Sequence, residues 1–122
     1  MNEVSKLRSV LELSFPTYTI YSGLIDEKVE KAISFIPNLP TREDDTASPI
    51  PFYSPNYTIY IQYSKKHSEA YEKAKEVYDL LYKYQDDECY VSAQNPLMFE
   101  GITDTGIQTF SFDCILYTRE RG

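Results

Sequence analysis

Residues 56–84 read NYTIYIQYSKKHSEAYEKAKEVYDLLYKY, and this stretch decides the fold class. Over residues 57–63 every second side chain is a large apolar or aromatic one, which is the period of a half-buried strand. Over residues 68–84 the apolar side chains recur at helical spacing and form one face. The residues expected on these buried faces are Tyr57, Ile59, Ile61 and Tyr63 in the strand, and Ala70, Ala74, Val77, Tyr78 and Leu81 in the helix.

The same two periods predict the remaining elements. Phe15-Pro16 ends the first helix, because a residue before proline avoids the helical region. The order of the elements predicts one α+β domain over residues 1–122, in which two helices pack on one face of an antiparallel or mixed sheet of about four to five strands. We expect a helix over Asn2–Ser14 and strands over Thr17–Tyr21, Lys31–Ile36, Cys89–Gln94 and Ile107–Thr118, the last two as a long hairpin.

The segment from about residue 37 to residue 56 differs from the rest of the chain. Its five prolines oppose regular sheet pairing, and a loop this long is uncommon in a compact domain unless it is functional or disordered. We therefore expect an exposed arm, used either as an assembly contact or as a tolerated surface insertion. The residues expected to make the assembly contact are Glu43, Asp44, Asp45, Phe52 and Tyr53.

Composition restricts the possible functions. The net charge is −7 in 122 residues, which argues against a free-standing nucleic-acid-binding protein, because contacts to phosphates need clustered Lys and Arg. Cys89 and Cys114 are too few and too far apart for a zinc site or a disulfide framework, so we expect buried thiols. No stretch has the composition of a signal peptide or a membrane span, which predicts synthesis in a reducing cytoplasm and no contact with a membrane.

Residues that could carry chemistry are few. His67 is the only histidine, and it is expected as an exposed residue at the start of the helix rather than as a general base. The acidic runs lack the alternation of a calcium loop, and the segment between Gly101 and Gly106 lacks the lysine of a phosphate-binding loop. The sequence therefore predicts no enzyme, no metal and no cofactor. The 12 tyrosines indicate protein interfaces more than stacking on nucleic-acid bases.

The layout of the chain resembles the tail terminator proteins of long-tailed bacteriophages, especially the small minor capsid proteins of phages that infect Gram-positive bacteria. The resemblance spans nearly the whole chain and rests on architecture and a diffuse residue pattern. It is carried by Ser14-Phe15-Pro16, Tyr18-Thr19-Ile20-Tyr21, the proline-rich loop, the strand over Tyr57–Tyr63, the helix with Ala70, Ala74, Val77 and Leu81, Asn95-Pro96-Leu97 and Tyr117-Thr118-Arg119.

This resemblance implies a non-enzymatic virion protein at the junction of tail and neck. Such a subunit forms a hexameric ring that caps the tail tube, binds the tube protein and the neck or head-completion protein, and lets DNA pass through its lumen. In that setting we expect Asp86, Asp87 and Glu88 to lie at an acidic lumen or rim. Three alternatives stay open: a head-completion or neck protein, an acidic inhibitor that imitates DNA phosphates, and an enzyme that uses His67 as a base.

Overall fold

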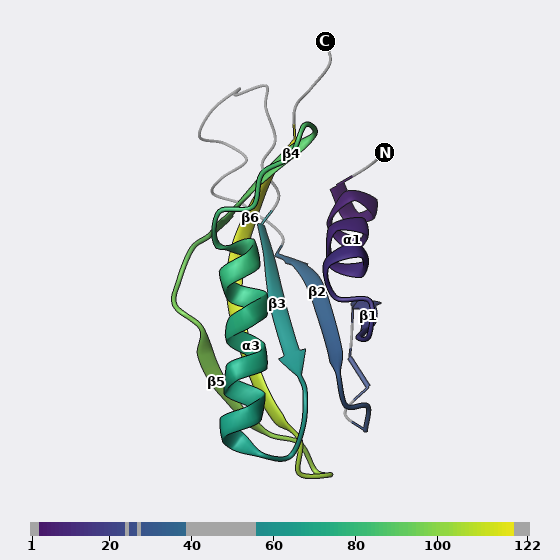
Figure 1. The fold of residues 1–122 in the computed structure, drawn as a ribbon, viewed down its shortest axis with the longest axis vertical. Helices are drawn as coiled ribbons and strands as arrows, with labels where there is room; N and C mark the ends of the chain where they lie inside the picture. Colours follow the sequence, from purple (N-terminus) through teal and green to yellow (C-terminus); the bar gives the residue numbers. More distant parts are fainter. Residues whose placement is uncertain (1–2, 24, 27, 39–55, 119–122) are drawn as a thin grey trace.

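The structure is a computed structural model that describes residues 3–23, 25–26, 28–38 and 56–118. Within these residues it has two helices and a mixed sheet of six strands, which confirms the predicted α+β class with one strand more than the predicted four to five (Figure 1). The elements are α1 (Glu3–Ser14), β1 (Thr19–Ser22), β2 (Ala32–Asn38), β3 (Asn56–Gln62), α3 (His67–Tyr82), β4 (Cys89–Ala93), β5 (Met98–Ile102) and β6 (Gln108–Thr118). Both helices end or begin within two residues of the predicted bounds.

The sheet has the order β1-β2-β3-β6-β4, and β5 pairs with β6 as well. Strand β6 is long enough to pair with β5 near its start and with β4 near its end along the same edge. Residues 94–97 connect β4 to β5. The side chain of Asn95 fills the gap between them: its Oδ1 accepts the amide hydrogen of Asp113 at 2.8 Å, as a paired backbone carbonyl would. The predicted pairing of the last two strands is thus confirmed, with an additional strand inserted between them.

Strand β1 runs parallel to β2, whereas all other pairs are antiparallel. A parallel pair needs a connection that crosses one face of the sheet. Here the described residues between β1 and β2 make that crossing, and Lys31 reaches the start of β2 with a φ of 57°. The connection is short and lies over the sheet, so it forms part of the uncovered sheet face described in the next subsection.

Strand β2 extends through Pro37 to Asn38, so the sequence prediction placed the start of the arm two residues too early. Strand β1 ends at Ser22, opposite Phe35, and beyond that point β2 has a neighbour on one side only. A proline is tolerated there because the sheet edge does not require its missing N–H. Residues 39–55, with Glu43, Asp44, Asp45, Phe52 and Tyr53, lie outside the described residues.

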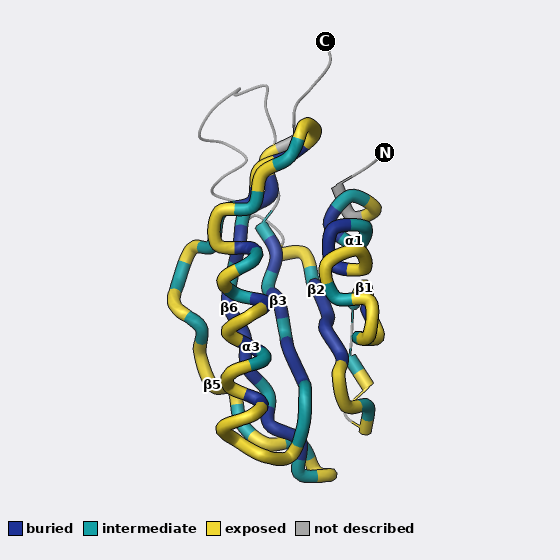
Figure 2. Tube along the Cα trace, in the orientation of Figure 1, coloured by how far each residue is buried: buried dark blue, intermediate teal, exposed yellow. Residues whose placement is uncertain are grey.

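The hydrophobic core lies between the two helices and one face of the sheet (Figure 2). Alternate residues of neighbouring strands meet in register on that face, as in the pairs Ile33 with Ile61 and Ile59 with Phe112. Helix α3 covers β3, β6 and β4, and α1 lies over β1. Both cysteines are free and fully buried in this core, as predicted. The helix residues that complete it are Leu7, Val10, Leu11, Ala70, Ala74, Val77 and Leu81.

Candidate functional site

The face of the sheet that neither α1 nor α3 covers, here called the open face, is built from the other half of the strand residues. A polar ladder crosses its middle: the Thr58 hydroxyl lies 2.7 Å from a carboxylate oxygen of Asp113 and 3.1 Å from the amide oxygen of Asn38. Asn38 in turn donates to Asn56 at 3.2 Å. These side chains pair their hydrogen-bonding groups with one another, so the middle of the open face needs no apolar layer to cover it.

At one end of the open face, the β1–β2 connection is fastened to the sheet by two buried polar side chains. The Ser34 hydroxyl donates to the carbonyl of Gly23, and the Gln62 amide donates to the carbonyls of Asp26 at 3.1 Å and Val29 at 3.0 Å. Both side chains are at most 1% exposed. Because buried polar groups must be paired, these bonds hold the connection in place over the sheet. We call this hydrogen-bonded connection the wall.

A groove of about 560 Å³ lies between this wall and strand β5. Its apolar lining comes from four separate elements: Ile25 of the connection, Ile36 of β2, Tyr60 of β3 and Ile102 of β5. Ile102 is 60% exposed.

The β5 side of the groove carries its charge. Glu100 and Asp104 line it, and none of its ten lining residues, all of them described, is a lysine or arginine. Glu100 follows Phe99, which faces the helix-covered side, so strand alternation turns Glu100 toward the open face, where it accepts a hydrogen bond from Ser111. The pairing of β5 then shifts between Phe99 and Gly101. Gly101 has a φ of 137° at this bulge, a conformation that favours glycine.

Aromatic side chains are exposed at two further places. At the other end of the open face, Tyr90 and Tyr117 are directly paired across β4 and β6 and stack with ring centroids 5.5 Å apart, each 39% exposed. On the helix-covered side, Phe99 packs edge-on against His67 and Phe110, yet it is 49% exposed. Tyrosines placed in this way supply contact area with a polar tip, as they do in protein interfaces.

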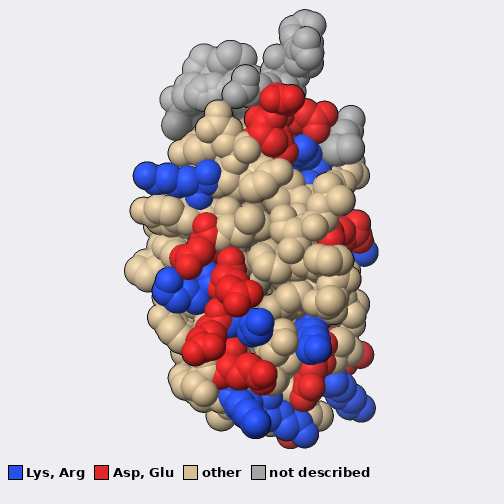
Figure 3. All heavy atoms as spheres, in the orientation of Figure 1, with Lys and Arg blue, Asp and Glu red and all other residues tan. Residues whose placement is uncertain are grey.

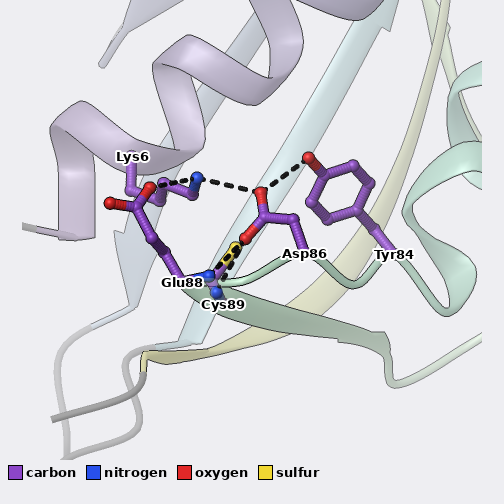
Figure 4. Close-up of polar contacts among 5 residues, drawn as sticks. All are labelled: Lys6, Tyr84, Asp86, Glu88 and Cys89. Atoms are coloured by element: carbon purple, nitrogen blue, oxygen red, sulfur yellow. Dashed lines mark hydrogen bonds and ion pairs between the residues drawn. The ribbon is translucent and has the colours of Figure 1, made fainter.

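The acidic run predicted at a lumen or rim is in part an internal contact (Figure 4). One Asp86 carboxylate oxygen accepts the backbone amides of Glu88 and Cys89 at 2.7 and 2.9 Å, and the other accepts the Tyr84 hydroxyl at 2.8 Å. Lys6 of α1 reaches the same carboxylate at 2.9 Å and that of Glu88 at 2.7 Å. Asp86 therefore ties α1 to the α3–β4 connection.

The electrostatics of this network follow from these contacts. Partial burial opposes ionisation of Asp86, but the hydrogen bonds donated by Lys6, two backbone amides and a tyrosine outweigh it, so the pKa of Asp86 lies well below its usual range. Hydrogen bonds to the two carboxylates likewise raise the pKa of Lys6. Asp87 is exposed. A position of Asp86, Asp87 and Glu88 at a lumen stays a prediction.

The structure also places the histidine and the two cysteines that the sequence analysis singled out. Burial raises the pKa of the Cys89 thiol to about 11 and that of Cys114 to about 12, so both thiols stay protonated near neutral pH. His67 is exposed, as predicted, and its Nδ1 lies 3.0 Å from the side-chain oxygen of Gln108. Across the part of the chain that the structure describes, no group of three His, Cys, Asp or Glu residues converges on a metal position.

The groove was missed by sequence reasoning, as was β5 itself. The one available signal was that Ile36 and Tyr60, which line the groove, occupy strand positions where the alternation predicts polar residues. In the described ranges, neither helix has the length and apolar character to cross a bilayer. Comparison of the chain with models of known protein families finds no match, and comparison with curated protein sequences finds none either.

Proposed function

We propose that this chain is a structural subunit of a phage virion, a tail terminator that acts through assembly contacts. The observation that carries the proposal is the open face: the two described helices lie on one side of the sheet, and the other side exposes stacked tyrosines and a groove lined in part by apolar side chains. Surfaces of this kind on a small domain are typical of interaction sites. The resemblance described from the sequence supplies the assignment to a tail terminator.

The exposed patches of the chain meet the requirement that a ring places on its subunits. A closed ring needs heterologous contacts, in which one patch of a subunit meets a different patch of the next. The chain offers dissimilar patches: the stacked tyrosines Tyr90 and Tyr117 at one end of the open face, and Met98 and Phe99 on the β5 edge. The mechanism is steric: the ring covers the growing end of the tube and presents a new surface to the neck, while DNA passes through the lumen.

An acidic inhibitor is a weaker reading, because imitation of DNA needs a row of carboxylates without interspersed cations. Figure 3 shows acidic and basic side chains mixed over the helix-covered side. On α3, Lys75 pairs with Asp79 at 3.0 Å and Lys73 lies 3.6 Å from Glu76. This mixture is typical of a solvated helix surface.

The first experiment measures mass by light scattering across a concentration series, followed by a tube-growth assay with the tail tube protein. Six copies of the 14.2 kDa chain would have a mass of roughly 85 kDa. We expect this species, alone or on tube ends, and we expect added protein to stop tube elongation. Tubes that elongate at the same rate with and without the protein would refute the assignment.

Variants test whether the open face carries the contacts. Tyr117→Ser removes half of the stacked pair, and Tyr82→Ser is the matched control, because Tyr82 is similarly exposed, at 46%, on the opposite side of the sheet. We expect Tyr117→Ser to reduce ring formation or tube capping and Tyr82→Ser to leave both unchanged. Equal effects of the two variants would remove the open face from the proposal.

A further inference from the structure

The groove on the open face has the chemistry of a peptide-binding site rather than of a solvated surface. Its lining combines aliphatic and aromatic side chains with two carboxylates, Glu100 and Asp104, and no described cation offsets them there. Lys65 packs its aliphatic stem over Gly106 nearby, but it is not among the lining residues. A ligand that fills this groove therefore gains most if it presents an apolar side chain beside a positive charge.

The dimensions fit a short extended segment. The lining runs across the neighbouring strands β2, β3, β6 and β5. Three spacings between adjacent strands amount to about 14 Å, which is the length of about four residues of extended chain.

Both walls are held in place before any ligand arrives. The connection on one side is fixed by Gln62 and Ser34 through the hydrogen bonds described above. On the other side the turn after β5 is closed by Thr103, which exchanges backbone hydrogen bonds of 2.9 Å with Ile107 and Gly106 and accepts the Ile107 amide on its hydroxyl at 3.1 Å. A pre-organised groove loses little conformational entropy on binding.

We propose that this groove binds an extended segment of a partner protein that carries an arginine or lysine next to an aliphatic side chain. The aliphatic side chain contacts Ile36, Tyr60 and Ile102, and the cation lies against Asp104 and Glu100. The inference rests on the proposed function only in that the partner belongs to the same assembly. Nucleic acid is disfavoured as an occupant because the two carboxylates repel phosphate.

The test is an array of immobilised hexapeptides whose four central positions run through every combination of Arg, Glu, Leu and Gly, probed with the full chain. Selected peptides are then titrated into the chain while amide chemical shifts are recorded. We expect selection of peptides with Arg beside Leu, and shifts at Ile36, Tyr60, Ile102 and Thr109. Selection of acidic peptides, no selection at all, or shifts that map to the helices would overturn the proposal.

Two variants with matched controls sharpen the result. Asp104→Lys should weaken binding of the selected peptide about tenfold, because it exchanges an attraction for a repulsion at an exposed site. Glu72→Lys makes the same charge change on α3 and should leave binding unchanged. Ile102→Ser should weaken binding by a similar factor, whereas Leu13→Ser, at a residue that is 83% exposed on α1, should not. Equal effects within either pair would overturn the proposal.

A second copy of the chain is the competing occupant. If the groove shifts appear on concentrating the protein alone, without peptide, a copy of the chain fills the groove and the proposed partner is wrong. These outcomes are read in a binding assay that involves no tube. A chain that stops tube growth but selects no peptide would thus overturn this inference and leave the proposed function intact. A chain that selects the expected peptides but does not stop tube growth would overturn the proposed function and leave this inference intact.

Discussion

The two faces of the sheet are made from alternate residues of the same strands, but they are stabilised in different ways. On the helix-covered face, Ile59 and Phe112 meet in register beneath α3 and are fully buried. On the open face, the adjacent residues Thr58 and Asp113 meet in the same register and hydrogen-bond instead. One face is held by the exclusion of water, and the other by polar groups that satisfy each other.

This comparison shows which parts of the molecule are available for contacts. The helix-covered face holds the hydrophobic core, and the helices over it expose a surface of mixed charge (Figure 3). The open face keeps partly exposed apolar side chains such as Ile36, Tyr60 and Ile115 that the fold does not cover. Stability and contact formation are thereby assigned to opposite sides of one sheet.

The largest expected effect is on the helix-covered face. Phe112→Ala should lower the free energy of unfolding by about 3–5 kcal/mol, because it leaves a cavity in a fully buried site. Ile115→Ala, three residues along the same strand but on the open face, should cost about 1 kcal/mol. Urea denaturation of the two variants measures both values, and equal losses would show that the two faces contribute alike.

The next effect concerns the tie between α1 and the α3–β4 connection. Asp86→Ala should cost about 2–4 kcal/mol, since it removes the acceptor of two backbone amides and of Tyr84 and leaves Lys6 with one partner. Asp87→Ala, at the exposed neighbour, should change stability by less than about 0.5 kcal/mol. A comparable loss in both variants would mean that the run acts through its total charge.

Acid titration gives a second measure of the same tie. The folded-state pKa of Asp86 lies below the ordinary value of 3.8, so its contribution to stability is fully present above that value. The contribution is lost as the pH falls below about 4 toward the depressed pKa, where Asp86 takes up a proton. The free energy of unfolding should therefore fall less steeply in acid for Asp86→Ala than for the unchanged chain.

A smaller effect is expected where the β1–β2 connection is fastened to the open face. Gln62→Leu removes the side-chain amide that donates to the carbonyls of Asp26 and Val29, and it should cost about 1–3 kcal/mol. Hydrogen exchange should also accelerate at Val29, whose amide donates to Asp26. Gln94→Leu is the control, because the side-chain amide of Gln94 donates to the nearby Ser92 and not to the β1–β2 connection. Unchanged exchange in Gln62→Leu would show that the wall is held by other contacts.

The smallest effect is an expected gain. The Tyr18 hydroxyl packs against the helix-covered core and is, among the described residues, a buried side-chain polar atom without a hydrogen-bond partner. Tyr18→Phe should raise the free energy of unfolding by about 1 kcal/mol. Tyr84→Phe is the opposite control, since it deletes a satisfied bond to Asp86 and should lower stability. Thermal unfolding distinguishes the two signs, and a loss in Tyr18→Phe would mean that the hydroxyl has a partner.

The sequence by itself determined the elements whose apolar residues recur with an uninterrupted strand or helix period. Strands β3 and β6 and helix α3 were predicted to within two residues, because period and burial are local consequences of one covered face. The ends of α1 and the exposure of His67 followed from the same local rules. Strand β5 was not predictable, because the bulge at Gly101 interrupts its alternation and its side chains are mostly exposed.

Only the tertiary structure decided the features that join distant parts of the chain. Lys6 and Glu88 lie 82 residues apart and make an ion pair, so an acidic run that reads as solvated is in part an internal tie. The groove between the β1–β2 connection and β5 likewise joins residues far apart in the sequence. The parallel pairing of β1 with β2 depends on the path of the connection over the sheet. Sequence periodicity records which face of an element is covered, but it does not record which elements meet.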